Sequence, residues 1–443
     1  MTNKKYFFIG IGGIGMSSIA HYLLEKGNTV FGYDKSINKS TKRLISQGVE
    51  IINDLSFNDV PDYMKSADVV VVYTPAIKED NIFLKYFRNN GLNRIYKRSE
   101  VLGEISNQGK CIAVAGTHGK TTTTAIIAHL LYSSGIKFKA FIGGFLKGYN
   151  SNYLNTGDDY IIIEADEYDR SFLQIEPDYA IITSIESDHL DVYGDFKSLK
   201  ESFELFKENV KKVLIADIDL DIDSDFSFSV DGNANYSIKK ITNLEDGIRF
   251  DFKTPDNFYS NIFVKMIGLH NLKNTLAALA LIDQIKEINF EKLLTSLSDF
   301  QGVERRMNVY KYKNKIIIDD YAHHPTEIES VINTLNTNYK NMSKAVVFQP
   351  HLFTRTRDFI NEFAEVLSKF DEVYLLDIYP AREKPITGIS SETLLEKINS
   401  PKKEIIEKES INNLIVDSKI DVITVLGAGN LSENLNVKIF ENV

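Results

Sequence analysis

Two glycine-rich loops in the first third of the chain contain the residue types of phosphate-binding sites. The first reads Gly10-Ile-Gly-Gly-Ile-Gly15 and the second reads Gly116-Thr-His-Gly-Lys-Thr121. Each loop follows an apolar run typical of a β-strand and precedes a segment typical of a helix. Backbone N–H groups and the positive end of a helix dipole bind anions in this arrangement. Two loops of different type predict a protein that binds two nucleotides and carries out chemistry between them.

The second loop has the end of a P-loop, in which a lysine reaches the terminal phosphates and the next hydroxyl residue ligates Mg²⁺. These residues are Lys120 and Thr121. The loop departs from the pattern G-x-x-x-x-G-K-[ST], because Val114 occupies the first glycine position and Gly116 is the additional glycine. We predict ATP binding here, in preference to a structural Gly-Lys-Thr turn.

The first loop leaves two alternatives open. It fits the pattern G-x-G-x-x-G, and Asp34 lies nineteen residues after Gly15. A dinucleotide-binding fold places an acid for a ribose hydroxyl at that position. The same glycines also permit tight packing of a strand against a helix. The residues alone therefore indicate either a nicotinamide site or a structural turn.

Further polar clusters follow predicted strands of the second third. The segment Glu164–Asp169 contains four carboxylates, which predicts either a divalent-cation site or a solvated acidic turn. Asp188 and His189 follow the next strand, where a histidine commonly does no more than make a hydrogen bond. Asn271 and Asn274 begin a helix, which they can cap, and an asparagine amide can also pair with an adenine edge.

Three clusters in the last third could contact substrates. Arg305 and Arg306 lie at a predicted hinge, as a solvated turn or as a clamp that reaches phosphate when domains close. The segment Asp319–Pro325 has two acids and two histidines, which suit proton transfer; zinc is less favoured because no other His or Cys has matching spacing. Arg355 and Arg357 could bind a substrate carboxylate, or could both be solvated.

The elements that must position these residues alternate between strand and helix in three successive parts of the chain. This alternation predicts parallel sheets covered by helices, with ligands at the carboxyl ends of the strands. Residues 217–265 are broken into short apolar stretches that predict an antiparallel β part. We predict three α/β domains with boundaries 1–107, 108–302 and 303–443. The predicted strands are Lys5–Ile9, Thr29–Tyr33, Glu50–Ile52, Ala67–Tyr73, Tyr160–Glu164, Tyr179–Thr183, Ile316–Asp319, Ala345–Phe348, Glu372–Leu376 and Asp421–Leu426.

The amino-acid composition excludes several classes of protein. The chain has 443 residues, of which 43% are hydrophobic and 25% charged, as in ordinary globular domains. A net charge of −10 argues against nucleic-acid binding, which needs a basic face. Cys111 is the only cysteine, so an internal disulfide is excluded. With neither a signal peptide nor a membrane-spanning stretch in the sequence, we expect a cytoplasmic protein without membrane contact, as a monomer or weak homodimer.

Eight segments, in the expected order along essentially the whole chain, resemble the Mur ligases of bacterial cell-wall synthesis. Within that family the chain is most similar to the branch that joins L-alanine to UDP-N-acetylmuramate; His118 is typical of this branch, whereas many other Mur ligases have Asn there. The segments are Gly10–Gly15, Gly116–Thr122, Glu164–Asp169, Asp188–Gly194, His270–Asn274, Arg305–Arg306, Asp319–Pro325 and His351–Arg357.

The resemblance implies a fold and a reaction. The fold has a Rossmann-like UDP-binding domain, a central P-loop ATPase domain with a mostly parallel sheet and a small antiparallel part, and a C-terminal Rossmann-like domain that receives the amino acid. In the reaction, ATP with Mg²⁺ phosphorylates the lactyl carboxylate of UDP-N-acetylmuramate. The amine of L-alanine attacks the acyl phosphate, and ADP and phosphate are released.

The resemblance also implies residue roles, carried over by position. Catalysis would involve Lys120, Arg305, His324 and His189. ATP would be bound by Gly116, Thr117, His118, Gly119, Lys120, Thr121, Thr122, Asn271, Asn274 and Asp320. Mg²⁺ would be held by Thr121, Glu164 and His189. The UDP-sugar would be bound by Gly10, Gly12, Gly13, Gly15, Asp34, Thr74, Ala76, Arg98 and Glu100. The amino acid would be bound by His324, His351, Arg355 and Arg357.

Two departures and three rival functions accompany this interpretation. Leu352-Phe353 replaces the Arg-Tyr that more usually follows the equivalent of His351, and Phe203 occupies the position where sibling ligases carry a modified lysine. The rivals are a ligase that recycles a whole tripeptide onto the same sugar nucleotide, an NAD-dependent oxidoreductase, and a nucleotide-dependent switch without ligase chemistry.

Overall fold

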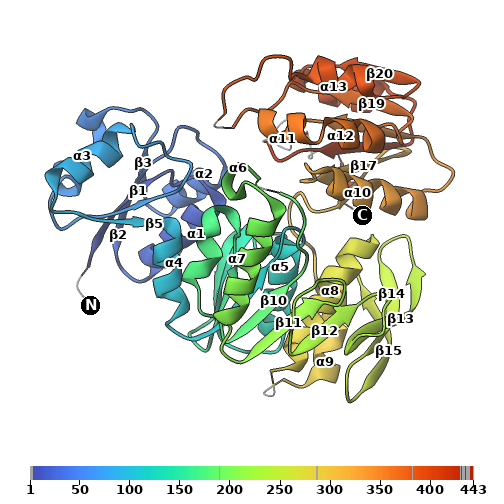
Figure 1. Cartoon of the computed structure of the whole chain (residues 1–443), viewed down its shortest axis with the longest axis horizontal. Helices are drawn as coiled ribbons and strands as arrows, with labels where there is room; N and C mark the ends of the chain where they lie inside the picture. The colour runs from blue at the N-terminus through green and yellow to red at the C-terminus, as the bar shows by residue number, and fades with distance from the viewer. Residues whose placement is uncertain are drawn as a thin grey trace. The chain divides into compact units, whose positions relative to one another are not determined.

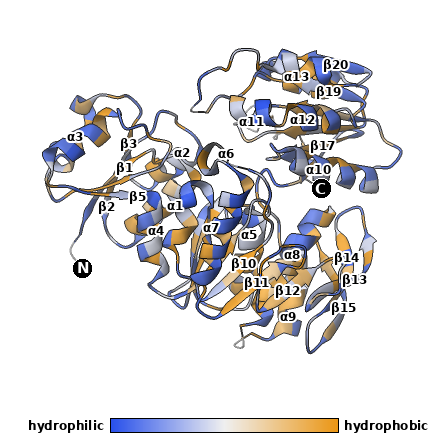
Figure 2. Cartoon of the chain, viewed as in Figure 1, coloured by the Kyte–Doolittle hydropathy of each residue, from blue (hydrophilic) through white to orange (hydrophobic). Residues whose placement is uncertain are grey.

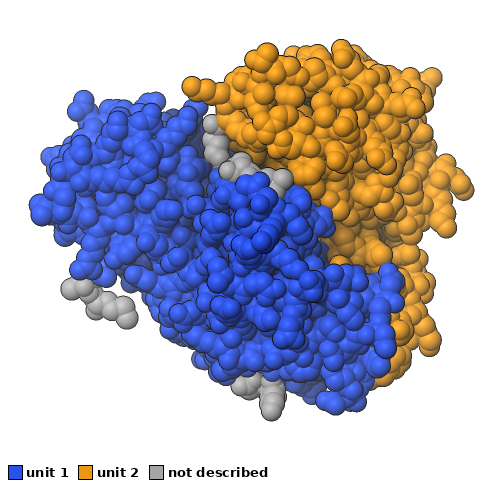
Figure 3. Space-filling view, viewed as in Figure 1, with its two compact units in different colours: residues 1–237, 253–257, 274–296 blue, residues 238–252, 258–273, 297–443 orange. Residues whose placement is uncertain are grey.

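The structure is a computed structural model that describes residues 3–188, 190–285, 288–381, 383–429, 431, 435 and 440–442. The chain forms two compact units, coloured separately in Figure 3. The first comprises residues 1–237, 253–257 and 274–296, and the second comprises residues 238–252, 258–273 and 297–443. Three β-sheets with covering helices make up these units (Figure 1). No helix in the described ranges is long and apolar enough to cross a membrane.

The N-terminal sheet has five parallel strands in the order β3-β2-β1-β4-β5. Phe7, Phe8 and Ile9 on the central strand are fully buried, as expected for a strand covered on both faces. The first three predicted strands are confirmed to the residue, while the fourth begins at Val70. The elements are β1 (Lys5–Ile9), α1 (Ile14–Glu25), β2 (Thr29–Tyr33), α2 (Lys39–Ser46), β3 (Glu50–Ile52), β4 (Val70–Tyr73), α3 (Ile82–Asn90), β5 (Arg94–Lys97) and α4 (Arg98–Ser106).

The central sheet has ten strands in the order β15-β14-β13-β12-β11-β10-β6-β9-β7-β8. Strands β10, β6 and β9 are parallel neighbours, so their carboxyl ends meet at one edge of the sheet. Figure 2 shows β10, β11 and β12 as largely hydrophobic. The elements up to β12 are β6 (Lys110–Ala115), α5 (Lys120–Ser133), β7 (Phe138–Leu146), β8 (Ser151–Asn155), β9 (Tyr160–Glu164), η3 (Tyr168–Gln174), β10 (Tyr179–Ile182), α6 (Leu190–Tyr193), α7 (Phe196–Glu208), β11 (Val213–Asp217) and β12 (Phe226–Ser229).

The predicted antiparallel part is confirmed for three strands and wrong for one. Strand β12 pairs in parallel with both β11 and β13. By contrast β13 (Tyr236–Asn243), β14 (Ile248–Lys253) and β15 (Phe258–Val264) are successive neighbours joined by four-residue connections, which only antiparallel strands allow. The following helix α8 (Leu269–Asp283) is fully buried from Leu276 to Ile282, and α9 (Phe290–Thr295) comes after it.

The C-terminal sheet has the order β20-β19-β18-β21-β17-β16-β22. The first five strands are parallel, and β16 pairs in antiparallel fashion with both β17 and β22. The four predicted strands are confirmed to within one residue at each end, and helix α10 begins at Pro325. The elements are β16 (Asn308–Tyr312), β17 (Lys315–Asp320), α10 (Pro325–Asn338), β18 (Lys344–Phe348), α11 (Phe353–Asp358), α12 (Ile360–Leu367), β19 (Glu372–Leu375), α13 (Ser391–Lys397), β20 (Lys402–Ile405), α14 (Ile411–Asp417), β21 (Val422–Leu426) and β22 (Glu441–Asn442). The predicted three-part α/β fold is therefore confirmed.

Candidate nucleotide-binding site

The P-loop connects the buried strand β6 to the first turn of α5. Its two glycines adopt backbone conformations that other residues rarely tolerate, with φ of +133° at Gly116 and +83° at Gly119. A Cβ atom at Gly116 would lie 2.1 Å from Thr183 Oγ1. The loop therefore needs glycine for conformation and for space, and it aims the N-terminal N–H groups of a fourteen-residue helix at one point.

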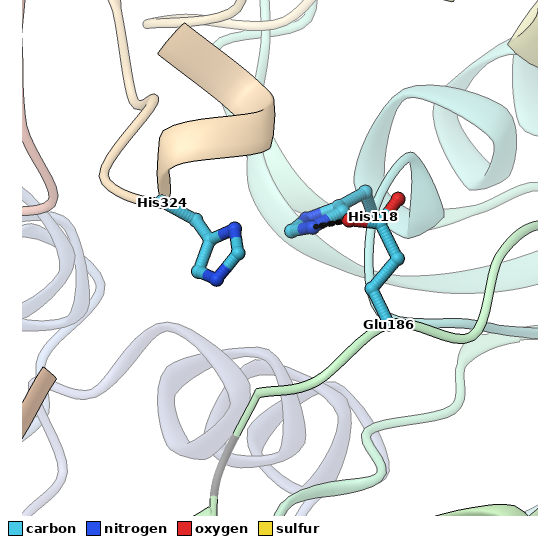
Figure 4. Close-up of side chains that lie close together, drawn as sticks. All are labelled: His118, Glu186 and His324. Atoms are coloured by element: carbon cyan, nitrogen blue, oxygen red, sulfur yellow. Dashed lines mark ion pairs between the residues drawn. The ribbon is translucent and has the colours of Figure 1, made fainter. Parts of the chain in front are cut away.

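The loop that follows β10 holds the P-loop in place. Ser184 accepts hydrogen bonds from two P-loop N–H groups: its carbonyl oxygen from Thr117 and its hydroxyl from His118, both at 2.9 Å. Thr183 Oγ1 donates to the His118 carbonyl at 2.5 Å. The His118 ring lies 3.4 Å from the Glu186 carboxylate (Figure 4). The P-loop is therefore a fixed feature of the first unit.

Lys120 lies over the P-loop in the first turn of α5. Its Nζ donates to the carbonyl of Gly116 at 2.6 Å, to that of Thr117 at 3.2 Å and to Glu167 Oε2 at 2.6 Å. Burial alone would lower the pKa of this lysine, but the negative charges of Glu167 and Asp166 outweigh that effect and raise it. Lys120 is thus a fully charged ammonium at the place where phosphates would bind.

Thr121 and Glu164 meet beside the same loop. Thr121 Oγ1 donates to Glu164 Oε1 at 2.9 Å, and the other carboxylate oxygen accepts the backbone N–H of Gly143 at 2.7 Å. A hydroxyl and a carboxylate are oxygen ligands of the kind that Mg²⁺ prefers, so these residues fit that ion. His189, the third predicted ligand, lies outside the described residues.

The two asparagines of α8 belong to different units. Asn274 lies against the P-loop, because a Cβ at Gly119 would be 2.3 Å from its Oδ1. Asn271 belongs to the second unit, and its side chain donates to the Ile267 carbonyl at 2.9 Å. Thr122 is buried in the first turn of α5. The structure thus brings Asn274 to the predicted nucleotide site within the first unit.

The first glycine loop binds the carboxylate predicted from its sequence. The N–H of Gly12 donates to Asp34 Oδ2 at 2.7 Å, and Gly10, with φ of +88°, lies against Thr74. Arg98 lies over Gly15, where a Cβ would be 2.6 Å from its guanidinium. These residues form one surface at the carboxyl end of β1. Gly13 is the residue immediately before α1.

Arg98 also connects this surface to the acidic segment. Its guanidinium lies 2.8 Å from Asp166 Oδ2, and the neighbouring Lys97 lies 3.0 Å from Asp169 Oδ2. Glu100 accepts the N–H of Lys97 and caps α4. Ala76 is exposed. Each of the four carboxylates in the segment therefore has its own partner, so a solvated acidic turn is not what forms.

In the second unit, Arg305 is bound by the loop after β21. Its guanidinium donates to the carbonyls of Gly427 and, at 2.6 Å, Gly429. Asp320 accepts the N–H groups of Met307 at 2.6 Å and Ala322 at 2.7 Å. Burial raises the pKa of the Asp320 carboxyl to about 6. The turn around Arg305, itself at φ of +59°, is thereby fixed.

The predicted amino-acid residues lie around the starts of α10 and α11. His324 precedes α10, and its Nδ1 lies 2.9 Å from Thr326 Oγ1. His351 stacks on Tyr379 with ring centroids 5.6 Å apart and lies 3.4 Å from the buried Arg355. The Arg357 side chain is 51% exposed and pairs with Asp358. The structure therefore groups His351 with Arg355, whereas Arg357 extends toward solvent.

Comparison with known proteins identifies the family. Three family profiles match in succession: "Mur ligase family, catalytic domain" over residues 5–110, "Mur ligase middle domain" over 114–282 and "Mur ligase, glutamate ligase domain" over 305–429. A protein of Christiangramia forsetii named UDP-N-acetylmuramate–L-alanine ligase is 41% identical over 98% of this chain and 96% of its own length. The chain belongs to the Mur ligase family.

Other Mur ligases resemble it in sequence and in structure. A Porphyromonas gingivalis protein of the same name is 39% identical, over 97% of this chain and 96% of its own length. The crystal structure of UDP-N-acetylmuramate–alanine ligase MurC from Thermotoga maritima has a TM-score of 0.83 and 26% identity, covering 97% of each chain. A murein peptide ligase from Psychrobacter arcticus shares the fold, with a TM-score of 0.71 at 22% identity and 98% of each chain covered.

The geometry of this Mur ligase adds one residue to those predicted from the sequence. Glu167 contacts Lys120 directly, although the sequence indicates only that it belongs to an acidic segment. The sequence feature that could have indicated Glu167 is its position just after the predicted strand Tyr160–Glu164. The pairing itself spans 47 residues, and no local pattern specifies it.

Proposed function

We propose that this Mur ligase joins L-alanine to the lactyl carboxylate of UDP-N-acetylmuramate, with ATP converted to ADP and phosphate. The observation that carries the proposal is a P-loop with a charged Lys120 and a Thr121–Glu164 pair, in a chain aligned over 98% of its length with a ligase of that name. The acceptor, L-alanine, comes from the names of the relatives.

The reaction requires activation of the acid. At neutral pH a carboxylate and an amine exchange a proton rather than condense, so the carboxylate must first become an acyl phosphate. Lys120 and Arg305 are cations suited to neutralise the charge that accumulates on the transferred phosphoryl group. His324 and His189 are the candidates to receive the amine proton. Exclusion of water would protect the acyl phosphate from hydrolysis.

Mg²⁺ is part of the proposal. Thr121 and Glu164, with His189, would hold the ion, which supplies positive charge beside the phosphates. The side-chain oxygens of Thr121 and Glu164 support this assignment, because Thr121 Oγ1 and Glu164 Oε1 already lie 2.9 Å apart. Asn274 beside the P-loop would contact the adenine together with Asn271, and Asp320 would contact the ribose.

The remaining substrates are assigned by position. The UDP-sugar would bind at the first glycine loop, supported by the gathering of that loop with Asp34, Thr74 and Arg98, and with Ala76 and Glu100 nearby in sequence. L-Alanine would bind near His324, His351, Arg355 and Arg357. We also infer domain boundaries at 107/108 and 302/303, a cytoplasmic enzyme, and a monomer or weak homodimer.

Phosphate release from ATP, measured with UDP-N-acetylmuramate and with L-alanine, the tripeptide or no acceptor, tests the proposal. Release that depends on both the sugar nucleotide and L-alanine, with a product heavier by one alanyl residue, is the expected result. Preference for the tripeptide would indicate the recycling ligase. Phosphate release that is the same with every acceptor and with none would indicate a nucleotide-dependent switch. Nicotinamide fluorescence titration would reveal an oxidoreductase.

A further inference from the structure

Glu167 is a buried carboxylate to which the proposed reaction assigns no role. Its side chain is 1% exposed, and its Oε2 lies 2.6 Å from Lys120 Nζ, whose own side chain is 13% exposed. A carboxylate is rarely buried so completely unless it is paired. Here the partner is Lys120, the residue to which the proposed function assigns the terminal phosphates of ATP.

The Lys120 ammonium has no donor to spare in this arrangement. A lysine ammonium has three N–H donors. Three oxygens accept from it, namely the carbonyls of Gly116 and Thr117 and the carboxylate of Glu167. A terminal phosphate can therefore bind this ammonium only by displacing one of them. Of the three, Glu167 is the only anion, and two anions cannot closely share a buried cation without mutual repulsion.

The backbone holds Glu167 at this place. Its carbonyl accepts a 2.5 Å hydrogen bond from the hydroxyl of Tyr193, which is buried. The next turn contains two non-glycine residues at positive φ, Asp169 at 55° and Arg170 at 54°. Such conformations persist only where surrounding contacts impose them. The carboxylate is therefore presented to Lys120 by a constrained segment.

We propose that Glu167 is a positioning residue that acts through Lys120, holding its ammonium in the nucleotide-free enzyme until the terminal phosphate of the nucleotide takes its place. The inference rests on the proposed function, because it assigns Lys120 to ATP. Exchange of one anion for another keeps the buried ammonium compensated throughout. It also makes nucleotide affinity a competition between phosphate and Glu167.

Binding of ADP, measured by isothermal titration calorimetry in EDTA, tests this exchange. Glu167→Gln removes the competing charge, and about tenfold tighter ADP binding is expected, since a charge-assisted hydrogen bond no longer has to be broken. Asp169→Asn is the matched control. It removes a charge from the same segment, but that carboxylate pairs with Lys97 and not with Lys120, so ADP affinity should stay unchanged.

Three results would overturn the inference: unchanged ADP affinity in Glu167→Gln, weaker affinity in that variant, or an equal gain in Asp169→Asn. If Glu167→Gln does not fold, Glu167→Asp retains the charge, shortens the side chain and should give a smaller gain in the same direction. A purely structural role would lower the unfolding temperature without tightening ADP binding. Turnover at saturating ATP should change less than affinity, and a large loss of kcat with unchanged affinity would place Glu167 in the chemistry instead.

The wild-type enzyme separates this inference from the proposed function. ADP binding with no acceptor-dependent phosphate release would refute the ligase function and leave the exchange to be decided by the Glu167→Gln titration. Acceptor-dependent release without a gain in that titration would refute the exchange alone. Absence of ADP binding to the wild type would refute both.

Discussion

Replacement of Gly116 by alanine should damage the P-loop far more than the same change at another left-handed glycine. Gly116 has φ of +133°, a region that is strained by about 1–3 kcal/mol for other residues. The new Cβ would lie 2.1 Å from Thr183 Oγ1 and 2.9 Å from the Ser184 nitrogen. Relief of this overlap must break the hydrogen bonding of the Thr183 hydroxyl, whose single proton is shared between the carbonyls of His118 and Ala115 and is worth about 1 kcal/mol. The sum is about 2–4 kcal/mol.

Gly135 provides the matched control for this prediction. It also has positive φ, at +72°, but a Cβ there meets nothing within 4 Å. Gly135→Ala should therefore destabilise the protein by only about 1 kcal/mol. Urea unfolding followed by far-UV circular dichroism suits a chain without tryptophan. Phosphate release by Gly116→Ala should fall by about 10²-fold, because a shift of about 1 Å in a positioning loop has that effect. Equal urea midpoints for the two variants, with Gly116→Ala still active, would refute the reasoning.

Three further predictions concern charge and metal. Lys120→Ala should lower acceptor-dependent phosphate release by at least ~10²-fold, as for loss of an oxyanion donor, and near-normal turnover would contradict the assignment. Thr121→Val should raise the Mg²⁺ concentration needed for half-maximal phosphate release, and EDTA should abolish wild-type release; an unchanged Mg²⁺ requirement would exclude Thr121 as a ligand. Burial, followed by the charge of Arg43, lowers the pKa of His21 to about 4, below its unfolded value of about 6.5. The unfolded chain then binds more protons, so unfolding free energy should fall by up to about 3 kcal/mol between pH 6.5 and 4; His21→Gln should flatten this slope in urea titrations, and an unaltered slope would contradict it.

The buried strands could be predicted from the sequence because parallel strands covered on both faces are continuous apolar runs. β1 and β9 are of this kind, and both match their predicted limits. β20, with the sequence Lys-Lys-Glu-Ile, lies at a sheet edge with mostly exposed side chains, and no apolar run marks it. The parallel pairing of β12 was mispredicted because short strands broken by polar residues do not reveal their direction.

The residues of the candidate site also fall into two groups, those marked by a local sequence pattern and those brought together only by long-range contacts. Lys120 and Thr121 could be predicted because a P-loop is contiguous, so spacing alone defines the geometry. The partners of the acidic segment could not, because Glu164 and Glu167 reach them across 43 and 47 residues. Only the parallel pairing of β6 with β9 determines that these chain segments meet.

That pairing also explains why neighbouring carboxylates have different partners. β9 ends at Glu164, so this side chain still follows the strand direction and reaches Thr121 at the edge of the sheet. Glu167 lies three residues further, past the strand end, where the chain has turned and its side chain meets Lys120 instead. One acidic run thereby supplies oxygen ligands suited to a cation and a counter-ion for the P-loop lysine. The division of roles arises from where the strand stops, which composition does not encode.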